Sequence, residues 1–314
     1  MTLPLLIISG PTASGKTAMS LKAASRFSNI EIINFDSLLF YKELNIGTAK
    51  PTQDEMSACP HHLIDICSAK DPLNAADYEK LALRVVEDIH SRGAIPLLTG
   101  GSGFYLQALL YGMFESKNVD EGTRLRSEKL YKDEGIAPFL EILRSEDPKS
   151  FERYHENDHY RVRRAVEHFW TTGSKFSEKR KEMMGQREEN SHIKTHGWDV
   201  FHAYLDPPKP VHFEIIQNRT KKMMDDGLIQ EVQSLIERGF TGKEKPLQSI
   251  GYKETFQYLR KELTLSETIE RINISTRQLA KAQRTWFKKV DKNEYDPLKD
   301  QDQVLTDMKN FLNI

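Results

Sequence analysis

The sequence predicts an α/β protein in which a parallel sheet is flanked by helices and carries an inserted all-helical domain. Four short apolar runs are typical of strands buried on both faces of a parallel sheet: residues 3–9, 31–35, 95–99 and 200–205. Helix-prone segments such as residues 16–27 and 75–90 separate these runs. This alternation indicates parallel strands joined by helices.

The inserted domain is predicted from a change of pattern after residue 113. Residues 114–195 are charged and helix-prone and contain no convincing strand. Within them we expect helices over residues 120–144, 161–171 and 174–185. The predicted core therefore consists of residues 1–113 and 196–314. Its last part contains two long predicted helices, at residues 211–238 and 265–290.

Composition limits the compartment and the class of protein. The 314 residues are enough for a full core, and 38% hydrophobic with 29% charged residues is ordinary for a soluble protein. No apolar run approaches the roughly 18 residues that cross a bilayer, so we expect no membrane role. The first residues lead into a strand without the features of a signal peptide, so we expect a cytoplasmic protein. Cys59 and Cys67 are then expected to be reduced.

The net charge of -1 argues neither for nor against nucleic acid, but basic residues cluster in two places. One group is spaced so that its members share a helix face: Arg277, Lys281, Arg284, Lys288, Lys289 and Lys292. The other lies in the insertion: Arg161, Arg163, Arg164, Lys175, Lys179, Arg180 and Lys181. Taken alone, each group is equally typical of a solvated helix face.

A phosphate-binding loop follows the first predicted strand. It reads Gly10-Pro11-Thr12-Ala13-Ser14-Gly15-Lys16-Thr17, which satisfies G-x-x-x-x-G-K-[ST] between a strand and a helix. Glycines permit the tight turns, loop amides and the helix N-terminus attract anions, and a lysine adds a full positive charge. The Thr17 hydroxyl can ligate Mg²⁺. The loop predicts a diphosphate ligand but leaves open whether it belongs to ATP, GTP or another molecule.

A carboxylate follows the second predicted strand, in Ile33-Asn34-Phe35-Asp36-Ser37. At the carboxyl end of a neighbouring strand, Asp36 falls in the crevice where open α/β sheets place their ligands. There it could hold Mg²⁺-bound water or take a proton from a nucleophile. A third strand leads into another glycine-rich turn, Gly100-Gly101-Ser102-Gly103.

Together with further strings, these segments resemble the tRNA dimethylallyltransferase (tRNA isopentenyltransferase) family, in its bacterial form without a zinc finger. The further strings are residues 46–51, 60–66, 157–167, 249–254 and 277–286. The resemblance covers nearly the whole chain. It implies a P-loop NTPase-like parallel sheet whose helical insertion contacts the tRNA anticodon stem-loop.

The resemblance also implies a reaction. The family transfers a dimethylallyl group from dimethylallyl diphosphate to the exocyclic N6 amine of the adenine on the 3′ side of the anticodon, and releases diphosphate. The implied cofactor is Mg²⁺, held by Thr17 and the diphosphate. The implied partners are tRNA and the prenyl donor, and we expect a monomer.

Site residues carry over one by one. The resemblance assigns Asp36 as general base, with Ser102 and Lys16 as the other catalytic residues. It assigns the diphosphate to Gly10, Thr12, Ala13, Ser14, Gly15, Lys16, Thr17 and Arg219. It assigns tRNA contacts to Asp36, Ser37, Tyr41, Gln53, Arg161, Arg164, Lys281 and Arg284. Two positions depart from the family pattern, because Ile215 and Ala282 stand where the family often has arginine. Lys209 or an arginine from elsewhere in the chain could supply the charge missing at Ile215.

The chemistry fits these residue types. An aromatic amine is a poor nucleophile, so a carboxylate that accepts its proton should contribute about 10²- to 10⁴-fold to the rate. A diphosphate leaves only when its charge is neutralised, which the loop and its cations can do. Candidates for an apolar prenyl pocket are Phe35, Leu38, Leu39, Phe40 and Tyr105, although core packing is as good an interpretation of each. The adenine must leave its stack, so the basic groups become credible RNA contacts.

Three other functions are alternatives to prenyl transfer to tRNA. A small-molecule kinase would use the same loop on ATP, with Asp36 activating a hydroxyl. An adenylate isopentenyltransferase would prenylate a free nucleotide with a similar catalytic half, although the insertion and the basic last helix favour RNA. A non-enzymatic RNA-binding module would not explain Lys16, Thr17 and Asp36 together.

Overall fold

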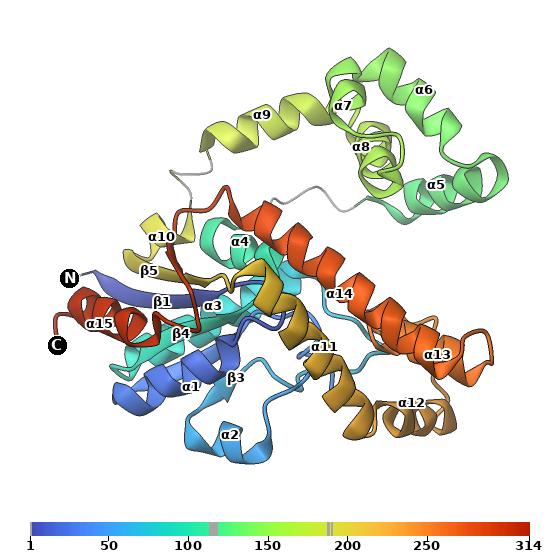
Figure 1. The fold of residues 1–314 in the computed structure, drawn as a ribbon. Coiled ribbons are helices and arrows are strands. Elements are labelled where there is room, and N and C mark those ends of the chain that lie inside the picture. The colour runs from blue at the N-terminus through green and yellow to red at the C-terminus, as the bar shows by residue number, and fades with distance from the viewer. Residues whose placement is uncertain (1, 113–118, 187–188, 190) are drawn as a thin grey trace. The chain divides into compact units, whose positions relative to one another are not determined.

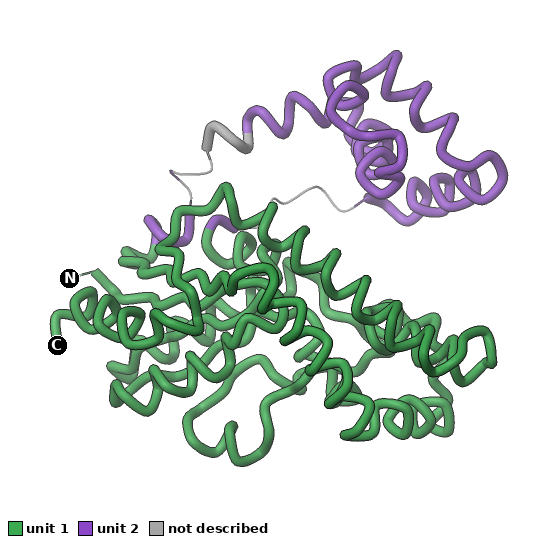
Figure 2. The backbone as a smooth tube through the Cα atoms, in the orientation of Figure 1, with its two compact units in different colours: residues 1–110, 196–314 green, residues 111–195 purple. Residues whose placement is uncertain are grey.

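The computed structural model describes residues 2–112, 119–186, 189 and 191–314. The chain divides into two compact units, which Figure 2 colours separately. Unit 1 contains residues 1–110 and 196–314, and unit 2 contains residues 111–195. The predicted boundary at residues 113 and 114 lies three residues further along and falls outside the described residues.

Unit 1 is built on a six-stranded parallel sheet, which confirms the predicted fold class (Figure 1). The strands are β1 (Leu3–Ser9), β2 (Ile30–Asn34), β3 (His61–His62), β4 (Ile95–Gly100), β5 (Trp198–Leu205) and β6 (Asn293–Tyr295). Their order is β3-β2-β4-β1-β5-β6. The edge strands β3 and β6 were not predicted from the sequence, because neither short strand contains an apolar run.

Helices α1 (Lys16–Arg26) and α15 (Gln301–Leu312) pack on one face of this sheet. Their Met19 and Met308 side chains share a buried cluster with Leu6 and Ile8 of β1. The alternate β1 residue Ile7 is also fully buried, as expected for a strand covered on both faces. Helix α3 (Ala75–Ser91) contacts β2 and β4, and α4 (Gly103–Tyr111) follows β4.

A second cluster in unit 1 packs later helices against the segment after β2. The helices are α11 (Lys209–Asp225), α12 (Leu228–Glu237), α13 (Tyr252–Leu259) and α14 (Leu265–Phe287), with a 3₁₀ turn at Lys245–Gln248. They bury Leu228, Tyr252 and Ile272 against Tyr41 and Leu44. The short helix α2 (Gln53–Ala58) precedes β3.

The prediction of one helix over residues 211–238 is wrong. Gly227 adopts a φ of 101°, which ends α11 and begins α12. The helix predicted over residues 265–290 is α14, which ends at Phe287. It begins with a capping box between Thr264 and Glu267.

Every secondary-structure element in the described residues of unit 2 is a helix, apart from turns. Its helices are α5 (Glu121–Glu134), α6 (Ala137–Glu146), α7 (Pro148–Arg153), α8 (His159–Thr172), α9 (Phe176–Gln186) and α10 (His192–Thr195). Gly135, with a φ of 73°, divides the segment predicted as helix over residues 120–144. Phe139 and Leu143 of α6 pack against Val162 and Val166 of α8.

In the parts of the chain that the structure describes, no helix is both long enough and apolar enough to span a membrane. Cys59 and Cys67 are free thiols, as expected.

Candidate active site

Four turns frame the candidate site, and each begins where a strand ends. The phosphate loop follows β1, Asp36 follows β2, Ser102 follows β4 and Asp206 follows β5. Because the strands are parallel, these turns leave the same edge of the sheet.

The phosphate loop is tightly constrained by its neighbours. Gly10 has a φ of 156°, and a Cβ there would lie 2.4 Å from the Leu205 carbonyl oxygen, so only glycine fits. Gly15 has a φ of 83° and forms the N-cap of α1. The Ser14 amide and the Lys16 ammonium both donate to the Pro11 carbonyl, over 3.2 and 2.8 Å.

Lys16, Asp36 and Arg219 form one electrostatic cluster. Burial lowers the pKa of Lys16 to about 8; nearby Asp36 opposes this shift, and Arg219 adds to it. Burial also lowers the pKa of Arg219, again against the effect of Asp36. The cluster therefore brings together two cations and one carboxylate, and a bound diphosphate would relieve the repulsion between the cations.

The Asp36 turn is held by Asn34. The Asn34 carboxamide accepts from the Asp36 amide over 2.7 Å and donates to the carbonyls of Asp36 and Leu63 over 3.1 and 2.9 Å. One Asp36 carboxylate oxygen accepts from the Leu38 amide over 3.2 Å. These bonds fix the carboxylate at the end of β2.

Ser102 joins two of the turns. Its hydroxyl oxygen accepts from the Ser37 amide over 3.2 Å. The Ser102 hydroxyl therefore lies beside the Asp36 turn. The sequence predicts that both residues act in catalysis.

Gln283 of α14 ties the phosphate loop to the turn after β4. Its carbonyl oxygen accepts from the Thr12 amide over 2.7 Å, and its amide group donates to the Gly101 carbonyl over 3.0 Å. Gln283 lies within the family string at residues 277–286, but this role was not predicted from the sequence. No local signal reveals it, because the Thr12 contact spans 271 residues.

Arg219 of α11 is positioned by backbone and side-chain acceptors. It donates to the Thr48 carbonyl over 3.1 Å and to the Thr12 hydroxyl over 3.5 Å. Glu231 holds the segment before Thr48 by accepting from the Ile46 amide over 2.8 Å and from the Tyr252 hydroxyl. The guanidinium therefore lies between the phosphate loop and an anchored turn.

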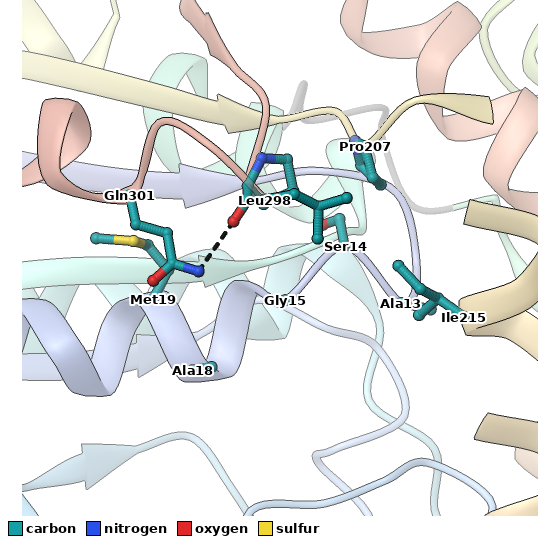
Figure 3. Close-up of a pocket in the computed structure, with 10 residues that line it drawn as sticks. Ala13, Ser14, Gly15, Ala18, Met19, Pro207, Ile215, Leu298 and Gln301 are labelled. Carbon is teal, nitrogen blue, oxygen red and sulfur yellow. Dashed lines mark hydrogen bonds between the residues drawn. The ribbon is translucent and has the colours of Figure 1, made fainter. Parts of the chain in front are cut away.

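Ile215 lies on the flank of the phosphate loop. It lines a cavity of about 200 Å³ together with Ala13, Ser14 and Gly15, and Figure 3 shows Ile215 beside Ala13. The family pattern often places an arginine at this position, and here the wall is apolar instead. At the loop, the positive charge of Arg219 repels that of Lys16 and contributes to the lowered pKa of Lys16.

Two aromatic candidates for the prenyl pocket pack against a third aromatic ring. The ring centroids of Phe40 and Tyr105 lie 5.3 Å apart, and both rings contact Tyr78 at 5.5 and 5.1 Å. Phe35 and Phe40 are fully buried, whereas Leu38, Leu39 and Tyr105 are half-buried. The half-buried three are therefore the better placed to contact a prenyl chain.

The predicted tRNA contacts in unit 1 divide into two kinds. Gln53 and Lys281 are exposed. Tyr41 is only 5% exposed and packs in the core, and Arg284 pairs with Asp206 over 2.6 Å. Tyr41 therefore offers little surface to RNA and Arg284 is half-buried in an ion pair, and both tRNA contacts stay predictions from the sequence.

Two further members of the basic groups point inward. Lys292 lies beyond α14, is 8% exposed in its side chain and pairs with Glu294 over 2.9 Å. Arg163 of unit 2 packs over the ring of Tyr131 at 4.6 Å and donates to Ser127. Neither residue was predicted to contact tRNA, but the burial of each reduces the basic surface that the sequence suggested.

Arg161 and Arg164 lie on α8 of unit 2. Arg161 has a side chain 66% exposed and pairs with Asp158, whose carboxylate also accepts from the Arg161 amide at the start of the helix. Arg164 is 43% exposed and pairs with Glu167 over 2.9 Å. Both guanidinium groups therefore keep a solvent-facing side.

Comparison with known proteins places the chain in a family. A sequence model described as IPP transferase matches residues 39–290. A protein of Geotalea uraniireducens named tRNA dimethylallyltransferase 2 is 39% identical over 285 residues, covering 91% of this chain and 89% of that protein. The tRNA dimethylallyltransferase of Caldanaerobacter subterraneus is 36% identical over 93% of this chain and 90% of its own.

Two solved structures of proteins with related names are also similar to this chain. The tRNA isopentenylpyrophosphate transferase of Bacillus halodurans matches with a TM-score of 0.71 and 33% identity, over 99% of this chain and 95% of that one. A eukaryotic dimethylallyltransferase acting on tRNA matches with a TM-score of 0.84 and 27% identity, over 99% of this chain and 80% of that one. With the phosphate loop, Asp36 and the helical insertion all in place, the chain belongs to the IPP transferase family.

Proposed function

We propose that this protein transfers a dimethylallyl group from dimethylallyl diphosphate to the exocyclic N6 amine of the adenine on the 3′ side of the anticodon in tRNA. The observation that carries the proposal is the cluster of Asp36, Lys16 and Arg219 at one edge of the sheet. The cluster supports the proposal because its carboxylate, which we propose as the proton acceptor, lies close to two cations suited to a diphosphate leaving group. Membership of the family supports tRNA as the acceptor.

In this reaction the bond between the prenyl C1 and the diphosphate oxygen breaks, and a bond between C1 and N6 forms. The electron pair of the broken bond goes to the diphosphate, where Lys16, Arg219 and the loop amides stabilise it. The amine proton goes to the Asp36 carboxylate. Ser102, which already contacts the Ser37 amide, is placed to orient a substrate by hydrogen bonding.

The loop fits a diphosphate in a further respect. Ser14 is 3% exposed, and its hydroxyl has no hydrogen-bond partner among the described residues. A buried hydroxyl without a partner is costly. Such a group is satisfied if a ligand oxygen accepts its proton.

We propose Mg²⁺ as the cofactor, with Thr17 as its protein ligand. Among the described residues, no group of three or more His, Cys, Asp or Glu side chains could hold a metal. That fits Mg²⁺ in a phosphate site, which keeps several waters and takes its other ligands from the substrate. When bound, the ion would neutralise part of the charge that develops on the leaving diphosphate.

The test is to incubate the protein with dimethylallyl diphosphate, Mg²⁺ and unmodified tRNA, and then to analyse the tRNA nucleosides by mass. We expect one adenosine per substrate tRNA to gain a dimethylallyl group, at the position 3′ to the anticodon. Phosphate transfer from ATP without prenylation would instead favour a kinase. Comparing AMP with an anticodon stem-loop as acceptor tests the adenylate alternative, which predicts that AMP is preferred.

The remaining proposals concern where and how the protein acts. We propose that Gln53, Lys281, Arg161 and Arg164 contact the tRNA, since each has exposed surface. The cytoplasmic compartment and the monomeric state stay predictions from the sequence.

A further inference from the structure

His212 of α11 is a completely buried histidine that contacts the phosphate loop. Its Nε2 atom lies 2.8 Å from the Thr12 carbonyl oxygen, and its Nδ1 atom lies 2.9 Å from an Arg284 guanidinium nitrogen. Arg284 in turn donates to Asp206 over 2.6 Å and to the Pro207 carbonyl over 3.0 Å. Nothing in the reaction described above uses this chain of contacts.

The partners of His212 determine its tautomer. A guanidinium can only donate, so Nδ1 must accept from Arg284 and carry no proton. A carbonyl can only accept, so Nε2 must carry the proton that is donated to Thr12. Asp206 holds Arg284 in place, and the neutral Nε2–H form of His212 is the one that satisfies both neighbours.

Thr12 is the loop residue on which these contacts converge. Its carbonyl accepts from His212, its amide donates to Gln283 and its hydroxyl accepts from Arg219. All three partners lie on α11 or α14. Helices α11 and α14 therefore hold the phosphate loop through all three polar atoms of Thr12, its amide nitrogen, carbonyl oxygen and hydroxyl oxygen.

We propose that His212 is a positioning residue, whose Nε2–H, oriented by Arg284 and Asp206, holds the Thr12 peptide in the conformation that binds the diphosphate of the substrate. His212 does not touch the reacting atoms and acts through the loop. The proposal rests on the proposed function only in naming the prenyl diphosphate as the ligand.

Acid should disrupt this arrangement. If His212 were protonated, its Nδ1 atom would carry a hydrogen that points at the Arg284 guanidinium. Nδ1 could then no longer accept the hydrogen bond from Arg284. Burial lowers the pKa of His212 below the ordinary value, Arg284 and Lys16 lower it further, and the Thr12 carbonyl and Asp206 oppose the shift. His212 therefore stays neutral across neutral pH, and acid removes the Arg284 contact that orients the ring toward Thr12.

The experiment compares His212→Leu, which removes both contacts, with His212→Gln, whose amide can still donate to Thr12 and never titrates. His202 provides a matched control, because it is also buried and also bonded through both nitrogens, to Ser9 and to the Asp291 carbonyl. For each variant we would measure inorganic diphosphate binding by calorimetry, KM and kcat for prenyl transfer, and the melting temperature.

We expect His212→Leu to weaken diphosphate binding and raise the KM for the prenyl donor about tenfold, with kcat within about threefold, since one hydrogen bond to a fixed loop is lost. His212→Gln should bind within about threefold of the unmodified protein. The unmodified protein should lose affinity relative to His212→Gln in acid, below the ordinary pKa of histidine. His202→Leu should lower the melting temperature without changing diphosphate affinity.

The proposal is overturned if diphosphate affinity is the same in His212→Leu as in the unmodified protein, or if His202→Leu weakens it equally. If His212→Leu does not fold, the diphosphate affinity of His212→Gln decides, because a loss of more than about tenfold in a variant that keeps the donor to Thr12 removes the Nε2–H from the role. Diphosphate binding is measured without tRNA, so a failure of prenyl transfer would count against the proposed function and leave this test intact.

Discussion

The lowered pKa of Lys16 predicts that diphosphate binding weakens in mild alkali. Lys16 has lost much of its hydration and lies near Arg219, so its pKa is about 8 instead of 10.5. A bound diphosphate adds negative charge beside the ammonium and raises its pKa in the complex. Because the free protein has the lower pKa, binding takes up a proton at pH values above about 8.

The size of the effect follows from the protonated fraction of Lys16. With a pKa of about 8, this fraction falls from about 0.9 at pH 7 to about 0.1 at pH 9. The dissociation constant for diphosphate should therefore rise about tenfold over this interval, which corresponds to about 1.4 kcal/mol. The affinity for diphosphate is highest well below the pKa of Lys16 in the free protein, and it falls as the pH rises through that pKa.

Calorimetry in two buffers of different ionisation enthalpy measures both the affinity and the proton uptake. Lys16→Arg is the matched variant, because a guanidinium stays protonated over the whole range. Its affinity should be nearly constant between pH 7 and 9, even if it is weaker overall. Lys16→Met should bind weakly at every pH and take up no proton.

Parallel pH profiles for the unmodified protein and Lys16→Arg would refute the reasoning, since the loss would then come from another group. The same conclusion would follow if the unmodified protein bound diphosphate at pH 8.5 without proton uptake.

Three further predictions test the site and its support. Asp36→Ala should lower kcat by about 10²- to 10⁴-fold while a gel-shift assay finds tRNA binding unchanged; near-normal turnover would remove Asp36 from the role of base. Gln283→Leu should raise the KM for the prenyl donor about three- to tenfold in steady-state assays, because two hydrogen bonds to the site turns are lost, and Gln283→Glu, which keeps the acceptor for the loop amide, should lie between. Gly103→Ala should destabilise the fold by about 1–3 kcal/mol in urea titrations, since its Cβ would lie 2.1 Å from the Trp286 ring, and an unchanged midpoint would contradict this.

The parts of the site that could be predicted from the sequence are those encoded by local pattern. The phosphate loop and Asp36 each follow an apolar strand, and parallel topology then places them at one edge. Helix breaks were harder to predict. Gly227 ends α11 inside a segment whose apolar periodicity continues into α12, so the pattern alone suggested one helix.

Long-range partners could not be predicted, because no local spacing encodes them. Arg284 carries the same charge and lies on the same helix as the exposed Lys281, yet its guanidinium turns inward to Asp206 and His212. Tyr41 was assigned to RNA from its place in a family string. Its burial depends on Leu228 and Tyr252, which lie 187 and 211 residues further along.

The two departures from the family pattern have different consequences in this structure. Ala282 is exposed on α14, so the missing arginine there removes surface charge and disturbs no internal contact. Ile215 instead lines the flank of the phosphate loop, where an arginine would have added to the positive charge. Without an arginine at position 215, Lys16 and Arg219 supply the positive charge described at the loop. A larger share of the attraction for diphosphate therefore depends on whether Lys16 is protonated. The alkaline loss of affinity should therefore diminish in Ile215→Arg, provided that the new guanidinium reaches the ligand, because the affinity at pH 9 would then depend less on Lys16.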